Sequence, residues 1–240
     1  MVNSIECVLD NVVIYTENVR IGAWTYFREK LDAAEMAGTV PPVRLTIGKG
    51  RSEYHYNLNI GQGGGAIRIG FKHNSAREHE DFYRMRIEFN PQKCNKLYNG
   101  FWKVYNELFY LHTRKVKQMD LAFDVSVPIA NVVVCSLTGR EKSYFKDTQY
   151  FGSSGNTGRL KVYDKKTELE ENQGIKIEDD AKTRIEYTKK FEEPMTPQIL
   201  SKCDIALNEE YKIAIFNGDT VKGELKACIL AMQNNLVNIN

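Results

Sequence analysis

Hydrophobic and polar residues alternate with a period of two through most of the first 90 positions. Such alternation puts successive side chains on opposite faces of an extended chain and is typical of half-buried β-strands. The alternating runs are separated by Gly, Asn or Pro, and they read VLDNVVIYT, VRLTIGKG, EYHYNLNIG, AIRIGFKHN and YRMRIEFN. The pattern therefore predicts a β-rich first half.

Two segments change to a helical period. Residues 25–37 carry apolar side chains at near-helical spacing and end at Gly38, before Pro41 and Pro42, as a helix end should. Residues 96–113 carry an apolar stripe formed by Leu97, Phe101, Val104, Leu108 and Leu111. We expect a helix in each segment.

Three pieces of the first half recur in the same order in the second half. IGQGGGAIRIGFK (60–72) parallels FGSSGNTGRLKVYDK (151–165), and YRMRIEFNPQK (83–93) parallels AKTRIEYTKK (181–190). VLDNVVIYT parallels MDLAFDVSV more weakly. Two explanations stand: short glycine-led hairpins resemble one another, or the chain contains two fused β-rich repeats.

These patterns predict an α+β fold with an antiparallel sheet whose helices pack on one face. We divide the chain into a β-rich half at 1–95, a second half at 96–192 and a helical tail at 193–240. The second half contains the strands around Asp120, Tyr163 and Glu186.

Composition narrows the functional classes. The formal charge is +2, from 33 Lys and Arg against 31 Asp and Glu, so any nucleic-acid surface must come from local clustering. The five cysteines form no CxxC pair, which fits a reducing compartment. No apolar run approaches the length of about 20 residues that a membrane helix needs. We therefore expect a cytoplasmic protein without a membrane partner.

Strand alternation places a tyrosine among charged residues. In GRLKVYDKK, the side chains of Arg159, Lys161 and Tyr163 share one face, and the intervening Leu160 and Val162 face the core. The neighbouring runs MDLAFD, TRIEYT and YRMRIEF have polar faces of the same kind. Those faces carry Asp120, Asp124, Arg184, Glu186, Arg84, Arg86 and Glu88.

Two interpretations of this face remain open. Carboxylates without Cys or His suit Mg²⁺ or Mn²⁺, which could polarise a phosphodiester that a tyrosine attacks. Alternating charges are also typical of the solvated face of an antiparallel sheet. Tyr144, Tyr150 and Tyr187 are other tyrosines nearby, and we expect each of them to be structural.

The ordered blocks MDLAFD, YFGSSGNTGRLKVYDKKTE and TRIEYT resemble the Rep_trans family of rolling-circle plasmid replication initiators and related relaxases of conjugative elements. The resemblance covers roughly residues 80–190. It implies that Tyr163 is the DNA nucleophile, assisted by Lys161 and Arg184. It also implies a divalent metal, Mg²⁺ or Mn²⁺, held by ligands among Asp120, Asp124, Glu186 and Glu88. The residues expected to contact DNA are Arg159, Lys165, Lys166, Arg84 and Arg86.

The resemblance implies that the protein nicks single-stranded or cruciform origin DNA, leaving a phosphotyrosine and a 3′-hydroxyl primer. A helicase and a second copy of the chain are further expected partners. Two alternatives come from other classes: an initiator that binds the origin without cleaving it, and a structural sheet module without any DNA role. The family often has an arginine where Lys161 stands, and this chain is short after residue 190.

Overall fold

The computed structural model describes most of the chain, with gaps at both ends and in several loops. The described residues are 6–48, 52–61, 66–74, 81–94, 96–153, 156–173, 182–195 and 207–216. Most of the predicted helical tail at 193–240 therefore lies outside the described residues. The three domain limits drawn from the sequence stay predictions.

A ten-stranded sheet dominates the fold, in the order β2-β3-β4-β5-β1-β6-β11-β10-β9-β8. Its strands are β1 (Glu6–Val19), β2 (Val43–Ile47), β3 (Tyr54–Ile60), β4 (Ile67–His73), β5 (Tyr83–Phe89), β6 (Arg114–Val125), β8 (Lys142–Phe145), β9 (Thr148–Phe151), β10 (Arg159–Asp164) and β11 (Thr183–Met195). A separate two-stranded sheet pairs β7 (Val132–Ser136) with β12 (Tyr211–Ile215). Neighbouring strands pair antiparallel, as in β4–β5 and β10–β11.

The chain forms two compact units. The first unit comprises residues 9–120 and 190–203, and the second comprises 1–8, 121–189 and 204–240. The first unit contains the strand series β1-β5-β4-β3-β2, and the second half of the sheet order repeats this series as β6-β11-β10-β9-β8. The three recurring sequence pieces therefore fall on corresponding strands, which supports the hypothesis of two fused β-rich repeats.

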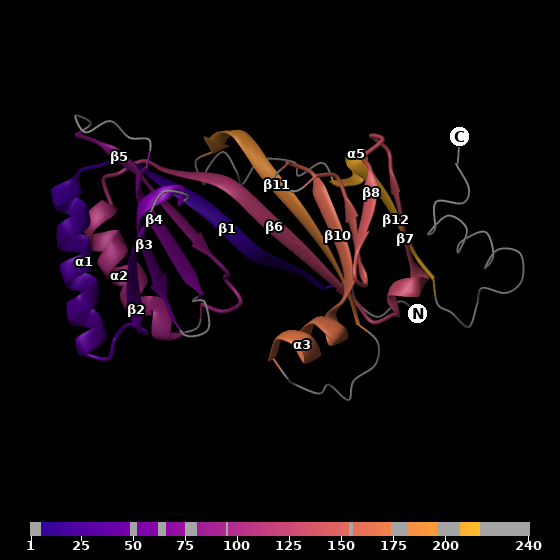
Figure 1. Cartoon of the computed structure of the whole chain (residues 1–240), viewed down its shortest axis with the longest axis horizontal. Helices are drawn as coiled ribbons and strands as arrows, with labels where there is room; N and C mark the ends of the chain where they lie inside the picture. The colour runs from indigo at the N-terminus through magenta and orange to yellow at the C-terminus, as the bar shows by residue number, and fades with distance from the viewer. Residues whose placement is uncertain are drawn as a thin grey trace, which may run out of the picture. The chain divides into compact units, whose positions relative to one another are not determined.

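Helices cover the apolar face of the first unit. α1 (Ile21–Met36) and α2 (Asn99–Phe109), which follows the short 3₁₀ turn η1 (Lys96–Tyr98), lie side by side against β2, β3 and β4 (Figure 1). α1 buries Trp24, Phe27 and Leu31. These side chains join strand residues such as Phe71, whose ring stacks on Trp24 at 4.6 Å between centroids. Burial of these aromatic rings fixes which face of the sheet stays polar.

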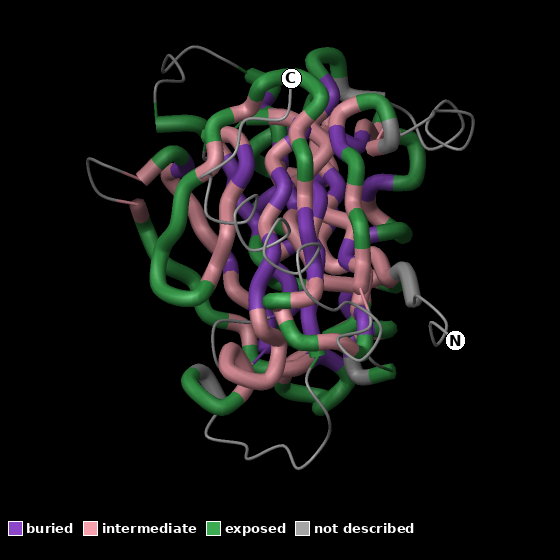
Figure 2. Tube along the Cα trace, turned by 90° about the vertical axis from the view of Figure 1, so that its right-hand side faces the viewer, coloured by how far each residue is buried: buried purple, intermediate pink, exposed green. Residues whose placement is uncertain are grey.

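The second unit is covered differently. Its core contains Leu160 and Val162 of β10 together with Ile185 and Tyr187 of β11. The small β7–β12 sheet packs against this core through its own apolar side chains, including that of Tyr211. η2 (Ile129–Asn131), α3 (Lys165–Gln173) and the one-turn α5 (Leu207–Glu210) complete the described elements. Figure 2 shows buried and less buried positions alternating along the strands, while the turns are mostly exposed.

The α+β prediction with an antiparallel sheet is confirmed, and both expected helices exist with shifted limits. α2 ends at Phe109, so Leu111 lies beyond it and is exposed, and the buried stripe is Phe101, Tyr105 and Phe109. The buried stripe differs from the predicted one because Phe101, Tyr105 and Phe109 are spaced by four, so their side chains lie along one face of the helix. In the part of the chain that the structure describes, no helix is both long and apolar enough to cross a membrane.

Candidate functional site

Tyr163 lies near the end of β10, which pairs with β9 on one side and β11 on the other. A tight turn leads into the strand, and Gly158 in that turn has φ +71°, in the left-handed region that favours glycine. A side chain there would also collide with Glu210 and Arg140. The turn is held by Tyr211, whose hydroxyl donates to the Gly158 carbonyl at 2.6 Å. Burial of Leu160 and Val162 then sends Lys161 and Tyr163 to the opposite face.

The phenol of Tyr163 meets a carboxylate from the neighbouring strand. Lys161 is paired with Glu186 across β10–β11, and Tyr163 is paired with Arg184. The Tyr163 hydroxyl donates to Glu186 Oε1, and Lys161 Nζ lies 2.9 Å from the other carboxylate oxygen, Oε2. The same ammonium lies 4.0 Å from the centre of the Tyr163 ring. Three residues predicted from alternation are thus brought into one cluster.

This environment keeps the phenol protonated. Tyr163 is only 5% exposed. Burial raises the pKa of its hydroxyl far above the ordinary value, the charge and hydrogen bond of Glu186 raise it further, and Arg184 opposes the shift. At neutral pH the tyrosine therefore needs a base to remove its proton during any attack. Glu186 already accepts that hydrogen bond.

Arg184 is fixed by Asp124 of β6. Its Nε and one terminal nitrogen lie 2.7 Å from the two carboxylate oxygens, a bidentate pair, and Lys182 Nζ lies 3.5 Å from Oδ2. The Asp124 side chain is 10% exposed. Burial raises the pKa of this carboxyl, but the hydrogen bonds and charge of Arg184 outweigh it, and the net pKa is lowered. Asp124 therefore stays ionised and holds Arg184 opposite Tyr163.

The other two predicted carboxylates lie in the first unit, joined by an asparagine. Asn11 Nδ2 donates to Glu88 Oε1 and to Asp120 Oδ2, each at 3.2 Å. Gln118 Nε2 donates to both oxygens of Asp120, at 3.1 and 3.3 Å. Glu88 Oε2 also pairs with Arg86 at 2.8 Å. The Asn11 amide nitrogen thus lies between the two carboxylates, at a position where both would attract a cation.

The predicted DNA-contacting cations lie in different surroundings. Arg84 pairs with Glu17 at 3.1 Å and is half-exposed, and the Arg159 guanidinium lies 4.6 Å above the Tyr150 ring. Lys165 pairs with Glu168 in the first turn of α3. The backbone N–H of Lys166 donates to Asp164 at 2.8 Å. These contacts orient several of the cations but do not show a DNA surface.

Tyr163 and Lys161 line an open pocket of about 250 Å³ beside α3. Its charged lining also includes Lys146 and four carboxylates, from Asp147, Asp164, Glu168 and Glu171. A phosphodiester entering here would need an added positive charge. Among the described residues, however, no group of three or more His, Cys, Asp or Glu side chains is arranged to hold a metal ion.

Three residues that take part in these contacts were not predicted from the sequence: Asn11, Gln118 and Lys182. Gln118 precedes Asp120 by two positions, so strand alternation alone could have placed it on the same face. Lys182 precedes Arg184 by two in the same way. Asn11 gave no such signal, because its meeting with Glu88 and Asp120 depends on strand neighbours that are distant in sequence.

Comparisons with known proteins place this arrangement in context. No protein-family model matches the chain. Two replication initiation proteins of Staphylococcus aureus are 29% and 28% identical to it over 112 residues, which is 44% of this chain and 35% of each relative. The matched part thus spans about a third of the length of these relatives. A rolling circle replication initiator protein from Geobacillus stearothermophilus aligns with a TM-score of 0.43 and 12% identity, covering 86% of this chain and 80% of that chain.

The staphylococcal match is a similarity in sequence, independent of the strand geometry around Tyr163. It agrees with the resemblance that the blocks MDLAFD, YFGSSGNTGRLKVYDKKTE and TRIEYT indicated. Over the matched 112 residues, this chain is therefore similar in sequence to replication initiation proteins.

Proposed function

We propose that this protein initiates rolling-circle replication by nicking single-stranded or cruciform origin DNA with Tyr163 as the nucleophile. The observation that carries the proposal is the hydrogen bond from the Tyr163 hydroxyl to Glu186, with Lys161 beside both groups. A nucleophile in hydrogen-bond contact with a base, itself held by a third group, is the arrangement that covalent catalysis needs. Similarity to staphylococcal replication initiation proteins supports the choice of DNA as substrate.

In the proposed step, the Tyr163 oxygen attacks a backbone phosphorus and its proton passes to Glu186. The bond from phosphorus to the 3′ oxygen breaks, and that oxygen leaves with the bonding electrons and takes a proton from water. The products are a 5′-phosphotyrosine link and a free 3′-hydroxyl. Proton transfer from the phenol is needed because burial and Glu186 keep it un-ionised at rest.

Transfer of the proton to Glu186 changes the group that the Lys161 ammonium faces. In the resting site its ammonium lies 2.9 Å from Glu186 Oε2, which balances its charge. Once Glu186 is protonated, that balance is lost and the ammonium can face the negative charge that develops on the phosphate. Arg184 remains in its bidentate pair with Asp124, which fixes its side chain opposite Tyr163.

The metal part of the proposal concerns the predicted ligands. Asp124 and Glu186 have both oxygens engaged by protein donors. Both oxygens of Asp120 and of Glu88 are engaged as well, but these two carboxylates share the Asn11 amide nitrogen, and a half-turn of that amide would present its oxygen to the same position. Two carboxylates and an amide oxygen suit Mg²⁺ or Mn²⁺. An ion held by these residues would supply positive charge to a phosphoryl oxygen bound beside it in the first unit.

A second function has its own supporting observation. Tyr163 is almost fully buried and its pKa is strongly raised, as expected of a structural tyrosine. An initiator that binds the origin without cleaving it and recruits replication proteins, such as a helicase, would need no exposed nucleophile. A homodimer is compatible with either function.

The test is formation of a covalent adduct. The protein would be incubated with labelled single-stranded DNA from its own replicon, with Mn²⁺ or with a chelator, and resolved on a denaturing gel. Tyr163→Phe should abolish a metal-dependent adduct, while the control Tyr150→Phe, on the neighbouring strand β9, should retain it. Binding to DNA without any adduct would replace nicking by the origin-binding function.

A further inference from the structure

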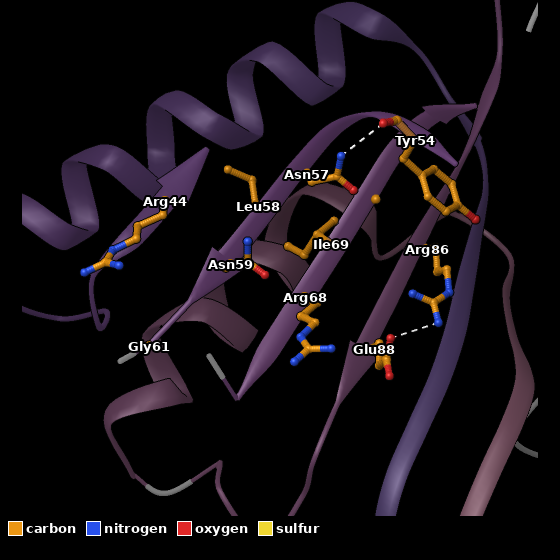
Figure 3. Close-up of a pocket in the computed structure, with 11 residues that line it drawn as sticks. Arg44, Tyr54, Asn57, Leu58, Asn59, Gly61, Arg68, Ile69, Arg86 and Glu88 are labelled. Carbon is orange, nitrogen blue, oxygen red and sulfur yellow. Dashed lines mark hydrogen bonds and ion pairs between the residues drawn. The ribbon is translucent and has the colours of Figure 1, made fainter. Parts of the chain in front are cut away.

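The first unit contains a pocket of about 490 Å³ on the polar face of its sheet (Figure 3). Three arginines from different strands line it, as labelled in Figure 3: Arg44 from β2, Arg68 from β4 and Arg86 from β5. Its three arginines take no part in the proposed nicking step, although Glu88 in its lining is a proposed metal ligand. Its lining residues are Arg44, Tyr54, Asn57, Leu58, Asn59, Gly61, Arg68, Ile69, Gly70, Arg86 and Glu88.

Strand register makes this pocket the counterpart of the Tyr163 cluster. Across β4–β5, Arg68 is paired with Glu88 and Gly70 is paired with Arg86. Across β10–β11, the corresponding pairs are Lys161 with Glu186 and Tyr163 with Arg184. Both units therefore present a cation, a glutamate and an arginine in the same relative positions. The difference lies at one position, where the first unit has glycine and the second has tyrosine.

A tyrosine from the neighbouring strand fills the space beside Gly70. A Cβ atom at Gly70 would lie 2.5 Å from Cγ of Tyr54, so the ring occupies the direction that a side chain would take. Figure 3 shows the Tyr54 ring on the same side of the sheet as Arg86. Glu88 is engaged by Arg86 at 2.8 Å and by Asn11 at 3.2 Å. The Tyr163 hydroxyl is hydrogen-bonded to a carboxylate, but no described carboxylate is hydrogen-bonded to the Tyr54 hydroxyl. No base is therefore in place among the described residues to remove a proton from Tyr54.

The charge of the pocket identifies its ligand class. Three arginines face one glutamate, which leaves a formal excess of two positive charges in the lining. Arginine is suited to phosphate because its planar donors bind two oxygens at once. Asn59, from the same lining, offers an amide that could meet a base edge, whereas the Asn57 amide nitrogen already donates to Ser52 and to the Tyr54 carbonyl. A volume of about 490 Å³ is in the range of small-ligand sites, large enough for a nucleotide.

We propose that this pocket is a non-cleaving subsite that binds a phosphodiester of single-stranded DNA through Arg44, Arg68 and Arg86. It retains the cations and the glutamate of the nicking cluster and has glycine, Gly70, in place of the nucleophile. The choice of DNA rather than another phosphate compound rests on the proposed function. The repeat would thus have kept binding in one half and chemistry in the other.

The experiment measures the salt dependence of binding, with the full chain carrying Tyr163→Phe so that no DNA is cleaved. Anisotropy of a short labelled single-stranded oligonucleotide would be followed at several salt concentrations. Arg44→Gln and Arg68→Gln should each weaken binding and flatten the plot of log K against log salt by about 0.7 for each lost phosphate contact. The matched control, Lys103→Gln, removes an exposed charge from α2 on the helical side of the unit and should leave the slope unchanged.

Unchanged slopes in both arginine variants, with folding confirmed by circular dichroism, would overturn the proposal. Inorganic phosphate that displaces the oligonucleotide fully, when chloride of equal ionic strength does not, would make this a free-anion site and would also overturn it. An adduct that persists in Tyr163→Phe and disappears on adding Tyr54→Phe would show that the pocket cleaves DNA, against a binding-only role.

The same variants with Tyr163 intact separate this subsite from the proposed nicking function. Flattened slopes without any adduct in the unmodified protein would support the subsite and reject nicking. A normal adduct with unchanged slopes would support nicking and reject the subsite.

Discussion

Asp124→Asn is the most direct test of how the site around Tyr163 is held together. The substitution keeps the side-chain shape but removes the charge that faces Arg184 through two contacts of 2.7 Å, and Lys182 at 3.5 Å. Because the two side chains of the pair are only 10% and 12% exposed, water cannot replace the lost partner fully. Breaking a buried pair costs about 3–5 kcal/mol, and asparagine keeps one acceptor, so we expect a loss of about 3 kcal/mol.

The loss should depend on pH in a defined direction. The pKa of Asp124 is lowered in the folded protein, so its contribution is present above the unfolded pKa of about 3.9 and disappears as pH falls through the lower folded value. The difference in unfolding free energy between the two proteins should therefore be full at neutral pH. It should shrink in acid, below about pH 4.

Urea denaturation at pH 7 and at several acidic pH values would measure this difference. Asp147→Asn is the control, because Asp147 is an exposed carboxylate of the same unit with no ion pair to a described residue. A loss no larger than that of the control, or a loss that stays constant into acid, would refute the role assigned to the Asp124–Arg184 pair.

Three further predictions concern single side chains. Glu186→Gln should slow adduct formation by about 10²-fold or more, because the amide cannot take the Tyr163 proton, and a time course on denaturing gels would show a normal rate if another base acts. Glu88→Gln should raise the Mn²⁺ concentration needed for half-maximal adduct, and a metal titration with unchanged midpoint would exclude Glu88 as a ligand. Gly70→Ala should destabilise the protein by about 1–3 kcal/mol through overpacking on the Tyr54 ring, and Tyr54→Ala in the same chain should remove most of that penalty in urea melts.

Much of the fold followed from periodicity. Alternation placed Lys161 and Tyr163 on a polar face, opposite Leu160 and Val162, because a strand has only two faces and burial selects one of them. The recurrence of three sequence pieces anticipated that β4 and β10 hold corresponding places in the strand order. Periodicity did not show that the small β7–β12 sheet, rather than a helix, covers the second unit.

The set of candidate residues was also a property of the sequence, since residue types and spacing carry the chemistry that each side chain can perform. Which of them meet was decided by tertiary structure alone. Glu186 accepts a hydrogen bond from Tyr163, and Asp124 forms an ion pair with Arg184. Asn11 donates to both Glu88 and Asp120. These contacts form only because strands distant in the chain pair in one register. A shift of one residue would turn each side chain to the other face, so register is set by the packing of whole apolar faces and not by any local pattern.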